Sequence, residues 1–261
     1  MNEFARRSKR EAERIASKHS VPEFYTLFKA PIASAKKLFF NSPDILRLRK
    51  IVEPKYHEEL GHGVFHSTRV SVDCAALVFI EAQAIRVKAL EVKHLMVLAI
   101  FSGLLHDICR DVENHAECGA EEAEKVLARD FDLSGSEIAC IGNAIRNHEA
   151  FCASATGGPQ WAQLLSDCLY DADKFRWGPD TFTHTLWYMA DHQGLSPRDL
   201  IERFPWGMSG TYRIIETFRT PTGRQYGPQI IETGVEIGKE IYRYLVQQYP
   251  EHPGENIRPE Q

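Results

Sequence analysis

The sequence predicts an all-α protein, and three observations carry that prediction. Apolar residues recur at the three- and four-residue spacing of a helix along most of the 261-residue chain. Serine–proline pairs at 42–43 and 196–197 supply a helix cap followed by a proline suited to the first helical turn. No segment of useful length alternates apolar and polar residues as a half-buried strand would. We therefore expect helices packed around one main core.

The first 52 residues are predicted to form an N-terminal helical extension. Residues 3–18 contain good helix formers and many charges but only a thin apolar stripe. This pattern is typical of a helix that is exposed or covered by a partner. Residues 43–52 begin with the first serine–proline pair and continue with apolar residues at helical spacing, which predicts a second helix.

A central group of helices is predicted next, within a main domain that we expect to span residues 53–249. Each segment has helical periodicity, and short polar or glycine-bearing breaks separate them. The run Leu95–Leu105 is too short to cross a bilayer and is interrupted by Ser102 and Gly103, so it predicts a buried helix. The predicted segments are 64–84, 93–108, 116–131, 134–148 and 160–177.

The C-terminal part is predicted to contain two helices and a loop. The second serine–proline pair begins one helix at Pro197. The segment PTGRQYGP at 221–228 predicts a turn-rich loop, because glycine and proline interrupt helices. An amphipathic helix is expected at 230–249, followed by a flexible tail at 250–261. The charged N-terminal helix and this amphipathic helix could together support a homodimer.

Composition restricts the partners that we expect. A net charge of −5 gives no general attraction to phosphate backbones, so we expect no nonspecific nucleic-acid binding. The charged N-terminus lacks the apolar stretch of a secretory signal, and no segment is predicted to span a membrane. The six cysteines form no CxxC pair, which favours free buried thiols in a reducing compartment. These features predict a cytoplasmic protein without membrane partners.

The clearest chemical feature is the segment IFSGLLHDICRD, where an apolar run ends in His106 and Asp107. A buried carboxylate is costly unless it is paired or bound to a metal. Adjacent residues on a helix project about 100° apart, which suits two ligands of one ion. A simple hydrogen-bonded pair would also explain this dipeptide. The choice between a metal site and such a pair therefore depends on the other motifs.

Further histidines and aspartates stand on both sides of this pair. His62 and His66 are four residues apart and would share one helix face. Asp171 and Asp173 lie in an otherwise apolar predicted helix. His115 and His148 are each expected near a helix boundary. Together these residues form an ordered series that could hold metal.

This order resembles the HD-domain superfamily, whose signature is a histidine, a His-Asp doublet and a distant aspartate. The resemblance covers residues 57–178, with HSTRV, LLHDI and DADK as the matching motifs. It implies an HD-domain helical bundle with additional N- and C-terminal helices. His62 is similar to the first histidine of a bacterial H-D-x-x-H subgroup, although Gly63 replaces that motif's aspartate. The implied metal ligands are His66, His106, Asp107 and Asp173.

The resemblance also raises the question of a second metal. The segments HAECGA and IRNH are similar to those of HD subfamilies with two metals, which adds His115 and His148 as candidate ligands. The alternative is that these histidines cap helices or bind phosphate without touching metal. One or two divalent transition-metal ions are therefore expected. Iron or manganese is favoured, and nickel, cobalt, zinc or magnesium would also fit.

The activity implied by the resemblance is hydrolysis of a small phosphorylated substrate, which could be a nucleotide, by water that the metal activates. A general base is not fixed, because Arg110 stands where some HD nucleotidases have a glutamate; Glu149, Asp171 and Asp111 are the candidates. Two alternatives remain, an HD-fold di-iron oxygenase acting on a small polyol or phosphonate and a regulatory domain that binds a nucleotide without turnover. The implied catalytic residues are Asp107, Asp171 and Lys174, and the implied substrate-binding residues are His62, Arg69, Arg110 and Lys174, with Arg146 nearby.

The aromatic residues after the last motif have two interpretations. Trp177, Phe182, Trp187 and Tyr188 could line a pocket for a flat group. Their helical spacing favours core packing instead.

Overall fold

The computed structural model describes residues 1–84, 88–152 and 159–250, apart from the side chain of Glu59. Within these ranges every regular element is a helix and none is a strand. The prediction of an all-α protein is therefore confirmed for the described residues. None of the described helices is long and apolar enough to cross a membrane. Beyond Pro250, the predicted flexible tail lies outside the described residues.

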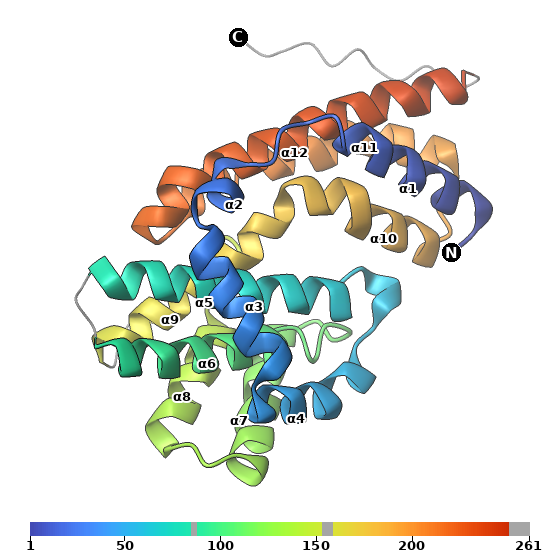
Figure 1. Ribbon diagram of the computed structural model, residues 1–261. Coiled ribbons are helices and arrows are strands. Elements are labelled where there is room, and N and C mark those ends of the chain that lie inside the picture. The colour runs from blue at the N-terminus through green and yellow to red at the C-terminus, as the bar shows by residue number, and fades with distance from the viewer. Residues whose placement is uncertain (85–87, 153–158, 251–261) are drawn as a thin grey trace.

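Figure 1 shows the helices in two groups. The lower group contains α4 (Pro43–Val52), α5 (Val64–Ala84), α6 (Ala89–Leu105), α7 (His115–Asp130), α8 (Gly135–Arg146) and α9 (Gln160–Lys174). The upper group contains α1 (Glu3–Ala16), α10 (Leu186–His192), α11 (Pro197–Tyr212) and α12 (Pro221–Gln248). Between them run α2 (Glu23–Leu27) and α3 (Lys29–Asn41), and α3 packs across α5.

Five short helical turns complete the described chain. Two of them, η1 (Glu53–Lys55) and η2 (Glu58–Leu60), precede α5. Two more, η3 (Phe175–Trp177) and the π-helical turn η4 (Thr181–Thr185), lead from α9 to α10, and η5 (Ile215–Thr217) lies between α11 and α12.

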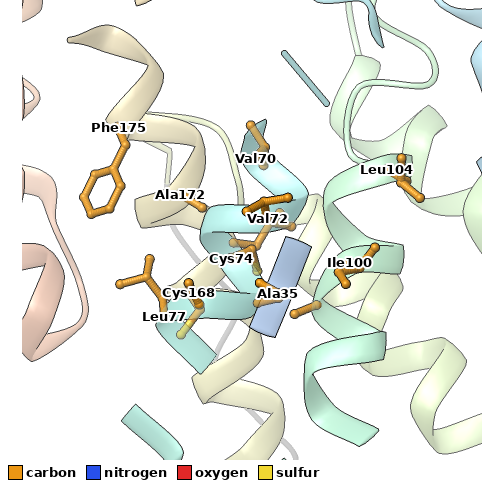
Figure 2. Packing of buried hydrophobic residues seen from close by; sticks show 14 of the residues in the cluster. Ala35, Val70, Val72, Cys74, Leu77, Ile100, Leu104, Cys168, Ala172 and Phe175 are labelled. Atoms are coloured by element: carbon orange, nitrogen blue, oxygen red, sulfur yellow. The ribbon is translucent and has the colours of Figure 1, made fainter. Parts of the chain in front are cut away.

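The centre of the lower group is a core of small and medium apolar side chains. Figure 2 shows side chains of α3, α5, α6 and α9 meeting there. All of the labelled side chains are buried: Ala35, Val70, Val72, Cys74, Leu77, Ile100, Leu104, Cys168, Ala172 and Phe175. Burial of each larger side chain stabilises the fold by roughly 1.5–3 kcal/mol. This core fixes α5, α6 and α9 against one another; His66 lies on α5, Asp173 lies on α9, and His106 directly follows α6.

One glycine determines how closely α5 and α6 approach. A Cβ atom on Gly103 would lie 2.5 Å from Ser71 Cα, so only glycine fits at this contact. Ser71 adds a hydrogen bond to Ser67 O (2.7 Å) within α5 and another to Ile100 O (3.3 Å) of α6. The contact lies three residues before His106 and five residues after His66. Close packing at Gly103 therefore brings these two histidines within reach of each other.

The predicted helices agree with the structure in most positions. Those at 43–52 and 64–84 are confirmed with the same bounds, and the predicted helix at 3–18 ends two residues earlier. The predicted helix at 93–108 instead runs from Ala89 to Leu105, so His106 and Asp107 follow the helix rather than lie within it. The helix starting at Pro197 is confirmed, with Ser196 and Asp199 forming a reciprocal cap. Three helices, α2, α3 and α10, have no counterpart among the predicted segments.

The predicted loop at 221–228 is wrong, because these residues form the start of α12. Thr220 caps this helix by accepting a hydrogen bond from Gly223 N (2.8 Å), and Pro221 occupies its first position. The two glycines serve packing rather than a turn: a Cβ on Gly223 would overlap the Asp171 carboxylate, and one on Gly227 would overlap the Phe218 ring. Close contact therefore explains the glycines that suggested a loop.

The N-terminal helix α1 is covered by its own chain. Its buried stripe consists of Ala5, Ser8, Ala12 and Ile15, and it packs against α10, α12 and η4. The division between an extension at 1–52 and a main domain stays a prediction. Core packing is confirmed for Phe182 and Trp187, whose indole donates a hydrogen bond to Phe182 O (2.7 Å).

The cysteines follow the prediction in part. All six are free, and three of them are buried, namely Cys74, Cys140 and Cys168. Cys152 is exposed, and the remaining two are partly buried.

Candidate metal centre

His66 lies in the first turn of α5, and the turn before the helix holds it there. Glu58 accepts a hydrogen bond from Val64 N (2.6 Å), which satisfies an otherwise unpaired amide at the helix start. A Cβ on Gly63 would overlap this carboxylate, so the glycine makes room for it. The helix begins at Val64, after His62. The prediction that His62 and His66 share one helix face is therefore wrong. The two rings are nevertheless neighbours, with centroids 4.8 Å apart.

The doublet of His106 and Asp107 lies where α6 ends and a turn begins. His106 Nδ1 donates a hydrogen bond to Gly103 O (2.8 Å), which fixes the ring and leaves Nε2 directed at the site. His106 is fully buried and Asp107 nearly so. Tyr56 donates its hydroxyl hydrogen bond to Leu104 O (2.5 Å), one of the carbonyls that the helix end leaves unpaired.

Two groups of three side chains each bring one potential ligand atom within 4.8 Å of one another. The first group comprises His66, His106 and Asp173, and the second comprises Asp107, His115 and His148. In the first group, His66 Nε2 lies 3.1 Å from His106 Nε2 and 3.2 Å from Asp173 Oδ1. We call the six residues together the cluster.

Asp107 connects the two groups through its two carboxylate oxygens. Oδ2 lies 3.6 Å from His66 Nε2 and 3.3 Å from His106 Nε2. Oδ1 faces the second group, at 3.8 Å from His115 Nε2 and 3.5 Å from His148 Nε2. Each oxygen of one buried carboxylate is thus directed toward a different group.

The histidines of the second group stand at helix ends, as predicted. His115 begins α7, and His148 follows α8. His148 Nδ1 donates a hydrogen bond to Ile145 O (2.6 Å), so its Nε2 is directed at Asp107 in the same way as that of His106. His115 Nδ1 lies 3.2 Å from Glu149 Oε1, while Arg110 Nη1 donates to its Nε2 at 2.7 Å.

Electrostatics keep the carboxylates of the cluster ionised. Burial alone would raise the pKa of Asp107, yet His106 and His148 hold that pKa well below its ordinary value. Burial likewise opposes ionisation of Asp173, but the Lys174 ammonium and the His66 ring hold its pKa well below the ordinary value. Lys174 Nζ lies 2.6 Å from Asp173 Oδ2, which leaves Oδ1 for the first group. Both aspartates are therefore in the state that ligates a metal.

Two of the histidines are kept neutral. Burial lowers the pKa of His66 to about 4, and burial together with the Arg110 charge lowers that of His115 to about 4. A neutral imidazole and an ionised carboxylate are the forms that bind a metal ion.

The side chains of the cluster fit a bound cation. Asp107 Oδ1 is buried and has no hydrogen-bond partner among the described residues, although buried carboxylate oxygens normally have one. The cluster also supplies imidazole and carboxylate ligands, a set that suits divalent transition metals. A buried histidine and aspartate cluster that could bind a metal ion is therefore present.

The predicted substrate-binding residues divide into two sets. Arg110 and Lys174 contact members of the cluster directly, and the ring of His62 lies beside that of His66 at a tilted angle. Arg69 follows His66 by about one turn of α5, and its Nε instead lies 2.8 Å from Asp180 Oδ2. Arg146 pairs with Glu117 (2.9 Å) and Glu124 (2.7 Å) rather than with a residue of the cluster.

Asp171, for which a catalytic role is predicted, binds the segment that leads into α12. Its carboxylate accepts hydrogen bonds from Arg219 N (2.8 Å), Thr220 N (2.8 Å) and Thr220 Oγ1 (2.7 Å). Residues two apart on a helix project about 200° apart, so Asp171 and Asp173 face in nearly opposite directions. Burial raises the pKa of Asp171 to about 6, against the effect of these hydrogen bonds. Asp171 thus joins α9 to the start of α12.

We expect Asp171→Ala to lower the stability of the protein without removing its metal. The substitution leaves one part-buried and two buried donors without their acceptor, and at about 1–3 kcal/mol for each unsatisfied group the loss should reach at least about 3 kcal/mol. Urea unfolding followed by circular dichroism measures the loss, and metal analysis of the folded variant is the control. Loss of metal at normal stability would instead show that Asp171 contributes to metal binding.

A buried ion-pair network beside the cluster was not predicted. Arg176 donates to Asp73 Oδ2 (2.5 Å) and to Asp180, and the Tyr25 hydroxyl also donates to Asp73 Oδ2 (2.7 Å). Asp73 follows His66 by seven residues, and Arg176 follows Asp173 by three. These helical spacings place each residue on the same side as a ligand, which is the signal that could have revealed the network.

The fold and the site define an all-helical protein with a buried histidine and aspartate cluster that could hold metal. Comparisons with family models, curated proteins and solved structures return no match for this chain.

Proposed function

We propose that the protein is a metal-dependent phosphohydrolase of the HD superfamily that cleaves a small phosphate ester, with a nucleotide as one candidate substrate. The observation that carries the proposal is the position of Asp107, whose two oxygens are directed at different groups of the cluster. A carboxylate shared in this way suits two adjacent divalent ions. Two such ions activate water and stabilise the attacking and leaving oxygens of a displacement at phosphorus.

The residues around the cluster have complementary roles in this proposal. His66, His106 and Asp173 would hold one ion, and Asp107, His115 and His148 would hold the other. Asp107 would contribute one oxygen to each site. Lys174 orients Asp173 through their contact of 2.6 Å.

Arg110 supplies positive charge next to the second group. Its Nη1 lies 3.9 Å from Asp107 Oδ1 and 2.7 Å from His115 Nε2. A guanidinium in this position can donate hydrogen bonds to the anionic oxygens of a phosphoryl group. Binding of a substrate or an ion would require Arg110 to release His115, so its side chain, one-third exposed, is the group that we expect to move.

Glu149 is the best-placed candidate for the general base. It contacts His115 Nδ1 at 3.2 Å, and its side chain is 34% exposed, so it can exchange a proton with solvent. Asp171 is engaged in the hydrogen bonds to 219–220, and Asp111 lies 3.9 Å from His57 with half of its side chain exposed. Of the three candidate bases, Glu149 is the one whose carboxylate contacts a residue of the cluster within the described part of the chain.

The direct test combines metal analysis with a substrate panel. The protein is purified under anaerobic conditions, its metal content is measured, and phosphate release is followed with phosphomonoesters, phosphodiesters and nucleotides after addition of iron or manganese. We expect about two ions for each chain and phosphate release without oxygen. No hydrolysis of any member of the panel by the metal-loaded protein would contradict the proposal.

His115→Ala separates a two-ion site from a one-ion site. Because His115 belongs only to the second group, we expect the variant to keep about one ion for each chain. We expect its activity to fall at least about 10²-fold, because one metal ligand is removed. His94→Ala is the control, since this exposed histidine pairs with Glu137 on another face. Unchanged metal content in His115→Ala would show that His115 is not required to hold an ion.

A di-iron oxygenase is the second candidate, because the same six side chains and the shared Asp107 would also suit two iron ions. Oxygen consumption that depends on a polyol or phosphonate would favour it. Phosphate release in the absence of oxygen would exclude it as the main activity.

A further inference from the structure

A separate cavity of about 580 Å³ lies between α3, α5 and α12. The segment 17–22, which joins α1 to α2, and part of the chain after α9 border it as well. None of the six cluster residues lines it. Cavities of this size commonly hold small molecules.

The walls of this cavity are apolar and come from regular helical stripes. Ile32 and Phe40 stand eight residues apart on α3, and Ile230 and Ile237 stand seven apart on α12. Val72 contributes from α5. Ile230 and Ile237 are only 1% exposed, whereas Phe40, at 53%, lies at the outside. Such walls favour a ligand with an apolar body that enters past Phe40.

Four charged residues of the lining form an ion-pair network with no net charge. Two arginines, Arg69 and Arg176, balance two aspartates, Asp73 and Asp180. Burial raises the pKa of the Tyr25 hydroxyl, so this group is neutral as well. The network satisfies Asp73 and Asp180, and a cationic ligand would find no unpaired acidic group there.

Two cationic side chains at the cavity retain unused donors. Lys36, exposed on α3, makes no hydrogen bond or ion pair with any described residue. Arg69 contacts Asp180 through Nε, and its two terminal nitrogens have no hydrogen-bond or ion-pair partner in the described part of the chain. With the network neutral, Lys36 gives the lining one net positive charge. A monoanionic head group therefore matches the cavity in charge and in available donors.

We propose that this cavity is a binding site for an amphipathic monoanion, namely an unbranched medium-chain carboxylate. Its chain lies between Ile32 of α3 and the isoleucines of α12. Its carboxylate accepts hydrogen bonds from Lys36 and Arg69. The site is independent of the metal cluster and of the activity proposed for it.

The test is titration calorimetry of the full-length protein with decanoate below its micelle concentration. We expect saturable binding of one decanoate for each chain. Decanol and decyltrimethylammonium, which have the same chain length but no negative charge, are expected to bind at least ten-fold more weakly. Equal affinity for the cationic amphiphile, or no binding of decanoate, would overturn the proposal.

Variants locate the binding on the structure. Lys36→Glu reverses the charge at the cavity and is expected to weaken decanoate binding at least ten-fold. Lys37→Glu is the matched control, because Lys37 is exposed next to it on α3 and does not line the cavity; we expect less than a two-fold change. If Lys36→Glu binds decanoate as tightly as the unmodified protein, the assigned site is wrong.

A second variant tests the apolar part without altering charge. Thr233 lines the cavity from α12, and the ring introduced by Thr233→Phe should enter the space proposed for the chain and weaken decanoate binding at least ten-fold. Circular dichroism checks that the variant is folded. Unchanged binding in folded Thr233→Phe would place decanoate elsewhere. If the variant does not fold, the two lysine variants still decide the question.

Discussion

Asp107→Asn is expected to abolish both metal binding and activity. The substitution keeps the size of the side chain but removes the charge that both groups of the cluster share. It also offers only one oxygen, so one of the two groups loses the oxygen that Asp107 supplies. A metal site contributes several kcal/mol of transition-state stabilisation, which corresponds to a loss of about 10³-fold or more in rate.

The measurement is metal content of the purified variant together with its rate on the best substrate of the panel. Asp111→Asn is the matched control, because Asp111 follows four residues later with half of its side chain exposed. We expect the control to keep its metal. An Asp107→Asn protein that retained full metal and full activity would refute the shared-ligand assignment.

Arg176→Met is expected to cause the largest loss of stability. Asp73 and Asp180 would remain buried without their main partner, and removing one partner of a buried ion pair costs about 3–5 kcal/mol. For a chain of this size that loss corresponds to a fall in Tm of roughly 10 °C. Thermal unfolding followed by circular dichroism measures it.

The control for this substitution is Arg198→Met, which removes the same type of side chain from an exposed pair with Glu202. Exposed pairs contribute about 0–1 kcal/mol, so its Tm should change by only a few degrees. Similar effects of the two substitutions would show that the buried network is not a main source of stability.

The fold could be predicted from the sequence where helical periodicity and caps agree. The segments beginning at Pro43 and Pro197 combine both signals, and the structure reproduces the bounds of the first and the start of the second. The prediction failed at 221–228, because local rules assign glycine and proline to turns. In the folded protein Gly223 and Gly227 are required by Asp171 and Phe218, which come close only through tertiary packing.

The candidate site could be predicted as a set of residue types but not as an arrangement. The motifs around His66, His106 and Asp173 identified side chains that the structure brings together. Spacing could not show that Asp171 points away, because its partners at 219–220 are distant in the sequence. Spacing also could not show that Arg110 contacts His115 of the cluster whereas Arg69 pairs with Asp180, because these contacts depend on the tertiary structure.

The candidate ligands come from separate segments of the chain, which links metal binding to the stability of the fold. The first group joins the start of α5, the end of α6 and the end of α9, and the second adds the turn after α6 and the ends of α7 and α8. An ion bound there would act as a reversible cross-link in a chain whose six cysteines are all free. It would close loops between these segments and favour the folded state by mass action. The melting temperature would then rise with the concentration of free metal, so thermal stability would report on occupancy.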